Sequence, residues 1–318
     1  MKNNRNTSLM SLALISLLGL SGCGSDDYAT DATVNKHIED TTHKVADEGH
    51  ATQTHTVSDE VIEEQRAALA FSIIGKDVGA QSPRDIDSVI GSNTKATTTA
   101  PLYTAMNLCD IHFHKSAEHK GGEFTTYAGN GDGEGYGSGY KYSGHLTASE
   151  TEDFHNDGSE VFTNAHNSLH SGDTIEVHYV YTSNAGKSLG HSLGTCLIGE
   201  NPLLRVETQV YVVVNDNTAA DFMYLTAVSG DGTAGHLYQA ANIPNDTGTA
   251  VEYEGSTTGP SYNEKVSPYQ VTWNVRPKIT KVNIESVGTW CHHNQFDEDH
   301  AHAVRNLVKN ADLLSAIH

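Results

Sequence analysis

The sequence has little positive charge, little cysteine and no apolar run long enough for a membrane span. Its 19 lysines and arginines stand against 40 aspartates and glutamates, which gives a formal net charge of −21. A chain of this charge repels polyanions, so nucleic acid is excluded as a partner, and the acidity favours solubility. The first apolar run, residues 9–20, is too short to cross a bilayer. The H-E-x-x-H motif of many zinc hydrolases is also absent.

The first 22 residues have the layout of a cleavable export signal, with lysine and arginine ahead of the apolar run. The sequence "LSGC" at its end, Leu20–Cys23, resembles the bacterial lipobox. This resemblance implies cleavage before Cys23 and lipid on its sulfur; an ordinary signal peptide with an incidental cysteine is the alternative. We therefore expect a lipid-anchored protein of the cell envelope on a periplasm-facing membrane. Gly24 favours the outer membrane if the cell is Gram-negative.

Residues 23–57 are polar and acidic, and they have too few apolar side chains to offset the entropy lost on ordering. We predict a disordered tether there, whose four histidines are solvated linker residues more readily than collectors of metal. Residues 58–318 are expected to form one domain. Its first segment, Ser58–Gly75, has apolar residues at helical spacing, acids in the first turn and glycine at the end, which predicts an amphipathic helix.

Beyond that helix, apolar residues alternate with polar ones. Residues 174–182, 205–215 and 268–275 each have the period of a strand, and the glycine-rich segment 121–174 predicts a long surface loop or a set of turns. The closing stretch 297–317 returns to helical spacing. We predict a mainly β (α+β) single domain on a twisted, largely antiparallel central sheet with peripheral helices.

Cysteine is scarce, and beyond Cys23 the number is odd: Cys109, Cys196 and Cys291. In an oxidising compartment one disulfide and one leftover thiol is the simplest arrangement. The spacing leaves the pairing open.

The segment "DIHFHKSAEH", residues 110–119, predicts half of a metal site. In an extended strand His112 and His114 lie on one face, while Ile111 and Phe113 point into the core. A catalytic zinc ion takes three protein ligands and keeps a fourth position open, so a neighbouring strand should supply the third. The segment "IEVHYVY" offers His178, with Glu176 on the same face to accept the distal ring N–H of a ligand. Two surface histidines on a sheet are the alternative.

Several segments in order resemble the alpha class of carbonic anhydrases: "QSPRDID" at 81–87, "HFHKSAEH" at 112–119, "IEVHYVY" at 175–181, "YEGSTTGP" at 253–260 and "YQVTWNV" at 269–275. Two departures are Asp110, where that class usually carries glutamine, and Gly259, which replaces a threonine. The compact C-x-x-H-x-H-x-x-x-E-H form, with Cys109 just ahead of the histidines, is more similar to the delta class. The chain therefore resembles a delta-type carbonic anhydrase.

This resemblance implies reversible hydration of CO2 to bicarbonate and a proton by a zinc-bound hydroxide, with CO2 and bicarbonate as the small-molecule partners. It implies His112, His114 and His178 as zinc ligands on a central strand pair. Thr258 would orient the hydroxide, and Glu118 would accept the proton of that threonine. Glu118 as a surface acid, Glu123 in its place, and Thr258 as ordinary turn chemistry stay open.

Three questions are left by the sequence. The apolar wall for CO2 is expected from Val180 or from residues 210–214. The residue that passes the proton to solvent is open, with candidates His119, His145, His155, His166 and His170 or bulk buffer. The cluster Cys291–His302 is interpreted as a solvated helix start, in preference to a second metal site.

A metal-handling lipoprotein without catalysis is the alternative function, and an inactive carbonic-anhydrase-like binding module is a further one.

Overall fold

The computed structural model describes residues 56–154, 169–184, 189–190, 193–199, 201–257, 265–305 and 308–317. The predicted signal peptide, the anchor cysteine Cys23 and nearly all of the tether lie outside the described residues, as do Thr258, His155 and His166. Among the helices that are described, none has the length and apolar character of a membrane span.

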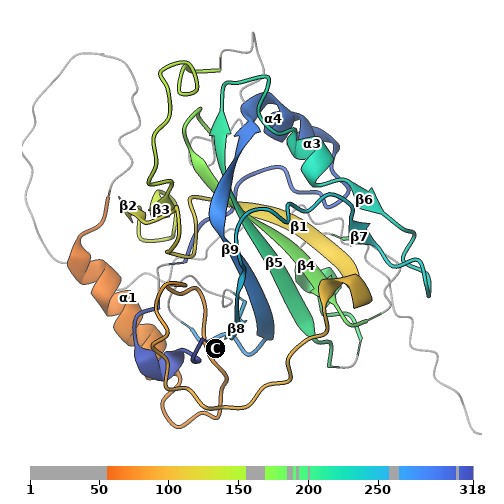
Figure 1. Cartoon of the computed structure of the whole chain (residues 1–318). Helices are drawn as coiled ribbons and strands as arrows, with labels where there is room; N and C mark the ends of the chain where they lie inside the picture. The colour runs from red at the N-terminus through yellow and green to blue at the C-terminus, as the bar shows by residue number, and fades with distance from the viewer. Residues whose placement is uncertain are drawn as a thin grey trace, which may run out of the picture. The chain divides into compact units, whose positions relative to one another are not determined.

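A five-stranded sheet forms the centre of the domain, in the order β1-β4-β5-β9-β8 (Figure 1). The strands are β1 (Asn107–Lys115), β4 (Thr174–Thr182), β5 (Leu204–Val214), β8 (Val251–Ser256) and β9 (Gln270–Asn283). All neighbouring pairs are antiparallel except β5 and β9, which run parallel. The prediction of a mainly β single domain is confirmed. After β8 the chain reverses direction to form β9. The strand β9 lies between β8 and β5, antiparallel to β8 and parallel to β5.

The smaller elements surround this sheet. They are α1 (Asp59–Ser72), η1 (Tyr103–Ala105), β2 (Thr126–Asn130), β3 (Ser138–Lys141), α2 (Leu193–Cys196), α3 (Phe222–Leu225), β6 (Val228–Ser229), β7 (Gln239–Ala240), α4 (Ile284–His293) and η2 (Ala311–Leu313). The helix predicted from Ser58 is present as α1. The β2–β3 hairpin lies inside the glycine-rich segment that was predicted as a loop or turns.

The helix predicted in the closing stretch is wrong. Its described residues form only the short η2, and the helix of this region begins earlier, at Ile284, where the Asn283 side chain accepts a hydrogen bond from the Ser286 N–H. Residues 294–305, here called the strap, instead run along β1. The His302 N–H donates to the Phe113 carbonyl (2.8 Å) and the Lys115 N–H donates to the His302 carbonyl (3.1 Å). Pairing with a sheet edge satisfies the same backbone groups that a helix would have satisfied.

The two faces of the sheet have different surroundings. On one face Ile111, Phe113 and Tyr179 are buried in the main apolar core, where Phe222 of α3 and Trp290 of α4 pack against them. The prediction that Ile111 and Phe113 point into the core is confirmed. The opposite face carries the polar row of β1 and β4, and it therefore has a different chemistry.

One disulfide, Cys109–Cys196, joins β1 to α2, and Cys291 is a buried free thiol. The expectation of one bridge and one leftover thiol is confirmed, and the structure resolves the pairing that the sequence left open. The bridge is next to the row of histidines, because Cys109 precedes Asp110 on β1.

Candidate metal centre

The structure brings His112, His114 and His178 together on one face of β1 and β4. His112 lies directly opposite His178 in the antiparallel register, and His114 lies opposite Glu176. The ring of His178 is 5.0 Å from that of His112 and 4.8 Å from that of His114, measured between centroids. One ring nitrogen from each histidine lies within 4.8 Å of the others, a spacing that could hold a metal ion.

The three rings belong to an edge strand and its neighbour, not to a central strand pair as predicted. The strap covers the outer edge of β1, where His114 and His302 form a bridge. A long-range contact of this kind leaves no periodic pattern in the sequence, so the strap could not be anticipated.

Each of the three rings is held by a hydrogen bond that one of its two nitrogens donates. His112 Nδ1 donates to Asp110 Oδ2 (2.7 Å), His114 Nδ1 to the Ala303 carbonyl (2.7 Å), and His178 Nε2 to Glu176 Oε1 (2.7 Å). With Asp110 ionised, these acceptors assign the ring protons, so Nε2, Nε2 and Nδ1 respectively carry lone pairs. Burial raises the pKa of the Asp110 carboxyl to about 7, so this assignment holds above that pH. His112 Nε2 and His178 Nδ1 are only 3.2 Å apart. Two lone pairs at this distance repel each other, and a cation between the rings would satisfy both.

Burial keeps two of these rings in the form that binds metal. Removal from solvent lowers the pKa of His112 well below its usual value and lowers the pKa of His114 to about 3. Both imidazoles are therefore neutral at neutral pH, which is the state that a metal ion requires.

Glu176 holds a second ring in addition to His178. Its carboxylate is fully buried and accepts from His119 Nδ1 (2.7 Å) and from the His119 backbone N–H (3.1 Å). Burial alone raises the pKa of this carboxyl, but the hydrogen bonds from the His119 and His178 rings bring the pKa well below its usual value. Glu176 is therefore an anion in the folded protein.

His119 had no role assigned from the sequence. Its Nε2 accepts from the Tyr253 hydroxyl (2.6 Å), and that hydroxyl also contacts Ser82 Oγ at 3.0 Å. This buried chain of hydrogen bonds connects the "QSPRDID" segment and β8 to Glu176. The only signal in the sequence was the Glu-His pair at 118–119.

Glu118 is buried beside the three histidines. Its Oε1 accepts from the Arg305 N–H (3.2 Å), and its Oε2 is 3.8 Å from His114 Nε2 and 4.0 Å from His178 Nε2. Its predicted partner Thr258 lies outside the described residues. The alternative Glu123 is exposed and accepts from the Ile279 N–H (3.0 Å), so it does not face the site.

The interpretation of Cys291–His302 as a solvated helix start is wrong for His302. Its ring lies parallel to that of His112, with centroids 4.9 Å apart and planes inclined by 17°. His302 Nε2 is 2.7 Å from Glu298 Oε2. Although burial lowers it, the pKa of His302 is raised overall by Glu298, Asp110 and Glu118. The ring reaches the site because the strap pairs with β1, not because of its position in a helix.

Apolar side chains continue the same face of the sheet across the next strands. Val180 follows His178 on β4, its register partner Val206 is on β5, and the Trp273 ring lies 5.0 Å from that of His178. Val210 is opposite Glu176 and faces the same way, whereas Tyr211 and Val213 belong to the main core on the other face. Val180 and Val210 thus lie where an apolar wall was expected.

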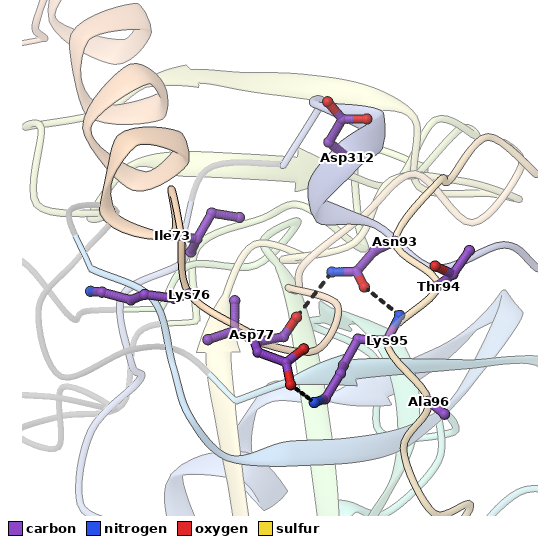
Figure 2. Close-up of a pocket in the computed structure, with 9 residues that line it drawn as sticks. Ile73, Lys76, Asp77, Asn93, Thr94, Lys95, Ala96 and Asp312 are labelled. Carbon is purple, nitrogen blue, oxygen red and sulfur yellow. Dashed lines mark hydrogen bonds and ion pairs between the residues drawn. The ribbon is translucent and has the colours of Figure 1, made fainter.

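A separate cavity of about 510 Å³ opens at the end of α1, between Ile73, residues 76–78, residues 93–96 and Asp312 (Figure 2). Lys95 and Asp77 form an ion pair across it, and the Asn93 amide donates to the Val78 carbonyl. None of its lining residues belongs to the histidine site. It contains no histidine or cysteine, and it is therefore not a second candidate for the chemistry.

Comparison with known proteins gives one family match. A family model described as delta carbonic anhydrase matches residues 103–286, more than half of the chain. No curated protein matches the chain.

Solved structures with low similarity are also carbonic anhydrases. A hyperthermostable carbonic anhydrase from an active hydrothermal vent chimney is 15% identical, with 77% of this chain and 90% of that chain covered and a TM-score of 0.28. The alpha-carbonic anhydrase of Photobacterium profundum is 13% identical, with 80% and 97% covered and a TM-score of 0.26. A halotolerant carbonic anhydrase from Dunaliella salina is 12% identical, with 73% and 85% covered and a TM-score of 0.30. At these TM-scores the likeness carries no argument about the site.

Proposed function

We propose that this chain, which belongs to the delta carbonic anhydrase family, hydrates CO2 at a zinc ion held by His112, His114 and His178. Membership of the family makes the chain a carbonic anhydrase; the proposal concerns the metal and the residues that use it. The observation that carries it is the proximity of three histidine rings, each of which donates its N–H proton to an acceptor. The free nitrogens of two of these rings, His112 Nε2 and His178 Nδ1, are 3.2 Å apart.

The donor set fits zinc. Three neutral imidazoles with one open position are typical of catalytic zinc sites, and nitrogen donors of this kind suit zinc better than magnesium or calcium. Zinc bound in this way supplies a Lewis-acid centre that makes water a nucleophile at neutral pH.

The protein's own residues would orient the ligands and provide a surface for CO2. Asp110, the Ala303 carbonyl and Glu176 keep the three rings in the ligand orientation. Val180 and Trp273 provide an apolar surface against which CO2 can rest without competing for hydrogen bonds.

Glu118 is the buried acceptor beside the histidines. If Thr258 donates its hydroxyl proton to Glu118, its oxygen is left only as an acceptor and orients the attacking water towards CO2. The burial of Glu118 next to His114 and His178 supports this part of the proposal.

Stopped-flow CO2 hydration of the full chain, together with metal content by mass spectrometry, tests the proposal. We expect one zinc per chain and fast hydration, with both lost in His112→Ala and in His178→Ala. His236→Ala is the control, because His236 is exposed in the turn between β6 and β7. Several zinc ions per chain with no hydration above background would make the metal-handling lipoprotein the better function.

We also propose that lipid on Cys23 anchors the protein to a membrane of the cell envelope. The lipobox-like sequence Leu20–Cys23 after an apolar run supports this. Detergent-phase partitioning of the wild type and of Cys23→Ser tests it. We expect the wild type in the detergent phase and the variant in the aqueous phase; a wild type in the aqueous phase would contradict the anchor.

A further inference from the structure

Hydration of one CO2 by one water yields bicarbonate and one proton, and that proton must leave the site before the next turnover. A group near the site that accepts the proton and passes it to a buffer base speeds this step. We propose that His300, on the strap, carries the proton between the site and solvent. This inference rests on the proposed function.

A row of three stacked rings leads from the site to the surface. The His302 ring stacks on that of His112 at 4.9 Å, and the His300 ring stacks on that of His302 at 5.3 Å with planes inclined by 26°. The exposed fractions of the three side chains rise along this row, from 12% for His112 through 31% for His302 to 46% for His300.

The other two site histidines are more enclosed, with side chains 7% exposed for His114 and 3% for His178. The site therefore faces solvent on the His112 side, where the row begins. Water on this side is the medium through which a proton can reach His300, because stacked rings themselves do not conduct protons.

The hydrogen bonds of His300 leave it ready to accept a proton. Its Nδ1 donates to Asp299 Oδ1 (2.6 Å), so Nε2 carries the lone pair. Within the part of the chain that the structure describes, this Nε2 has no hydrogen-bond partner. When Nε2 accepts the proton, the ring becomes a cation beside Asp299; when a buffer base removes the proton, the original tautomer returns.

Two carboxylates lie along this part of the row. Asp299 contacts the His300 ring directly, and Glu298 holds the neighbouring His302 ring at 2.7 Å. His302 is the positioning ring between the site and His300, because its Nε2 is held by Glu298 and its ring stacks on those of both His112 and His300.

The histidines suggested by the sequence are less suited to this role. His119 is fully buried with both ring nitrogens engaged, by Glu176 and Tyr253. His145 and His170 are exposed, and neither has a ring contact with the site among the described residues. His155 and His166 lie outside the described residues.

Kinetics of the zinc-loaded full chain in weak buffer test the assignment. In His300→Ala we expect kcat to fall by up to about a hundredfold, the low end of the range for a positioned acid–base residue, while kcat/KM stays unchanged. The split arises because attack on CO2 precedes proton release. Imidazole added to the buffer should restore kcat. His236→Ala is the matched control, an exposed histidine outside the row, and should behave as the wild type.

A second readout is independent of activity. Nitrogen-15 NMR at a pH where the ring is neutral should show the His300 proton on Nδ1 in both zinc-free and zinc-loaded protein, and zinc content should be equal in all variants. A proton on Nε2, or an unchanged kcat in His300→Ala, would overturn the inference. If the wild type does not hydrate CO2, the proposed function falls with it; if wild type, His236→Ala and His300→Ala hydrate CO2 equally fast, only the His300 assignment falls.

Discussion

Two histidines of the site are oriented by carboxylates and the third by a backbone carbonyl. A carboxylate two residues earlier on the same strand holds His112, a backbone carbonyl of the strap holds His114, and Glu176 holds His178. The first and third acceptors are side chains spaced by two residues from the ring that they hold. The backbone acceptor has no such signature in the sequence, because every residue carries the same backbone carbonyl.

Glu176→Gln tests the importance of these acceptors. The carboxylate accepts from His178, from the His119 ring and from the His119 backbone, and an amide can accept at only one of its two terminal atoms. We expect the affinity for zinc to fall by about 10- to 100-fold. Competition with a chelator measures it.

Glu123→Gln is the control for this substitution, because Glu123 is exposed and bonds to the Ile279 N–H away from the site. Equal zinc affinities in the two variants would show that Glu176 does not orient a ligand.

At the scale of the elements, the site depends on contacts that join segments far apart in the chain. The strap meets β1, the disulfide joins β1 to α2, and the segment 142–154 is fastened to β9 through Glu150 and Lys281. None of these contacts belongs to the ladder of the central sheet. These contacts fix the strap, α2 and the segment 142–154 against the sheet, and the contribution of each contact to stability can be measured separately.

The Cys109–Cys196 bridge should contribute measurably to stability. It closes a loop with a sequence separation of 87 residues, and such a cross-link limits the freedom of the unfolded chain. We expect Cys196→Ser to lower the free energy of unfolding by about 2–5 kcal/mol, measured by urea denaturation. A reducing agent should lower the stability of the wild type and leave the variant unchanged; an insensitive wild type would contradict the bridge.

Glu150 should stabilise the protein in a pH-dependent way. The hydrogen bond from Lys281, with those from Thr147, lowers the pKa of Glu150 from 4.5 to about 2. Because the folded pKa lies below the unfolded one, this stabilisation is complete above about pH 4.5 and is lost as the pH falls to about 2.

In Glu150→Gln we therefore expect lower stability than in the wild type at neutral pH, with the difference shrinking through this acid range. Urea denaturation at several pH values measures it. Glu152→Gln is the control, since Glu152 is exposed two residues further on. A difference that is constant with pH would argue against the ion pair.

At the scale of the whole molecule, the central sheet separates a structural face from a chemical face. The main core of Phe113, Tyr179, Phe222 and Trp290 lies on one side, and the histidines with their acceptors lie on the other. The core is therefore complete without the residues that would hold the metal.

Removal of zinc should accordingly lower the melting temperature without unfolding the chain. A bound ion stabilises the folded state by about 4 kcal/mol when its free concentration is about a thousand times Kd. We expect calorimetry to show a lower Tm after treatment with a chelator, while circular dichroism still shows the sheet. An unfolded metal-free protein would mean that the site, and not the core, holds the fold together.

The sequence by itself determined four of the five strands of the central sheet, β1, β4, β5 and β9, and the face on which their side chains lie. Alternation with period two placed His112, His114, His178 and Glu176 on the polar face, and Ile111 and Phe113 in the core, because successive residues of a strand point to opposite sides. The mainly β fold and the number of disulfides followed from the same local patterns and from composition.

Only the tertiary structure decided which distant segments complete the site. The Ala303 carbonyl on His114, the Arg305 N–H on Glu118 and the His302 ring on His112 all come from the strap, whose sequence has helical spacing. Backbone donors and acceptors are the same at almost every residue, so their long-range pairing leaves no mark in the sequence. The open edge of β1 provided the partner, and that edge exists only once the sheet has formed.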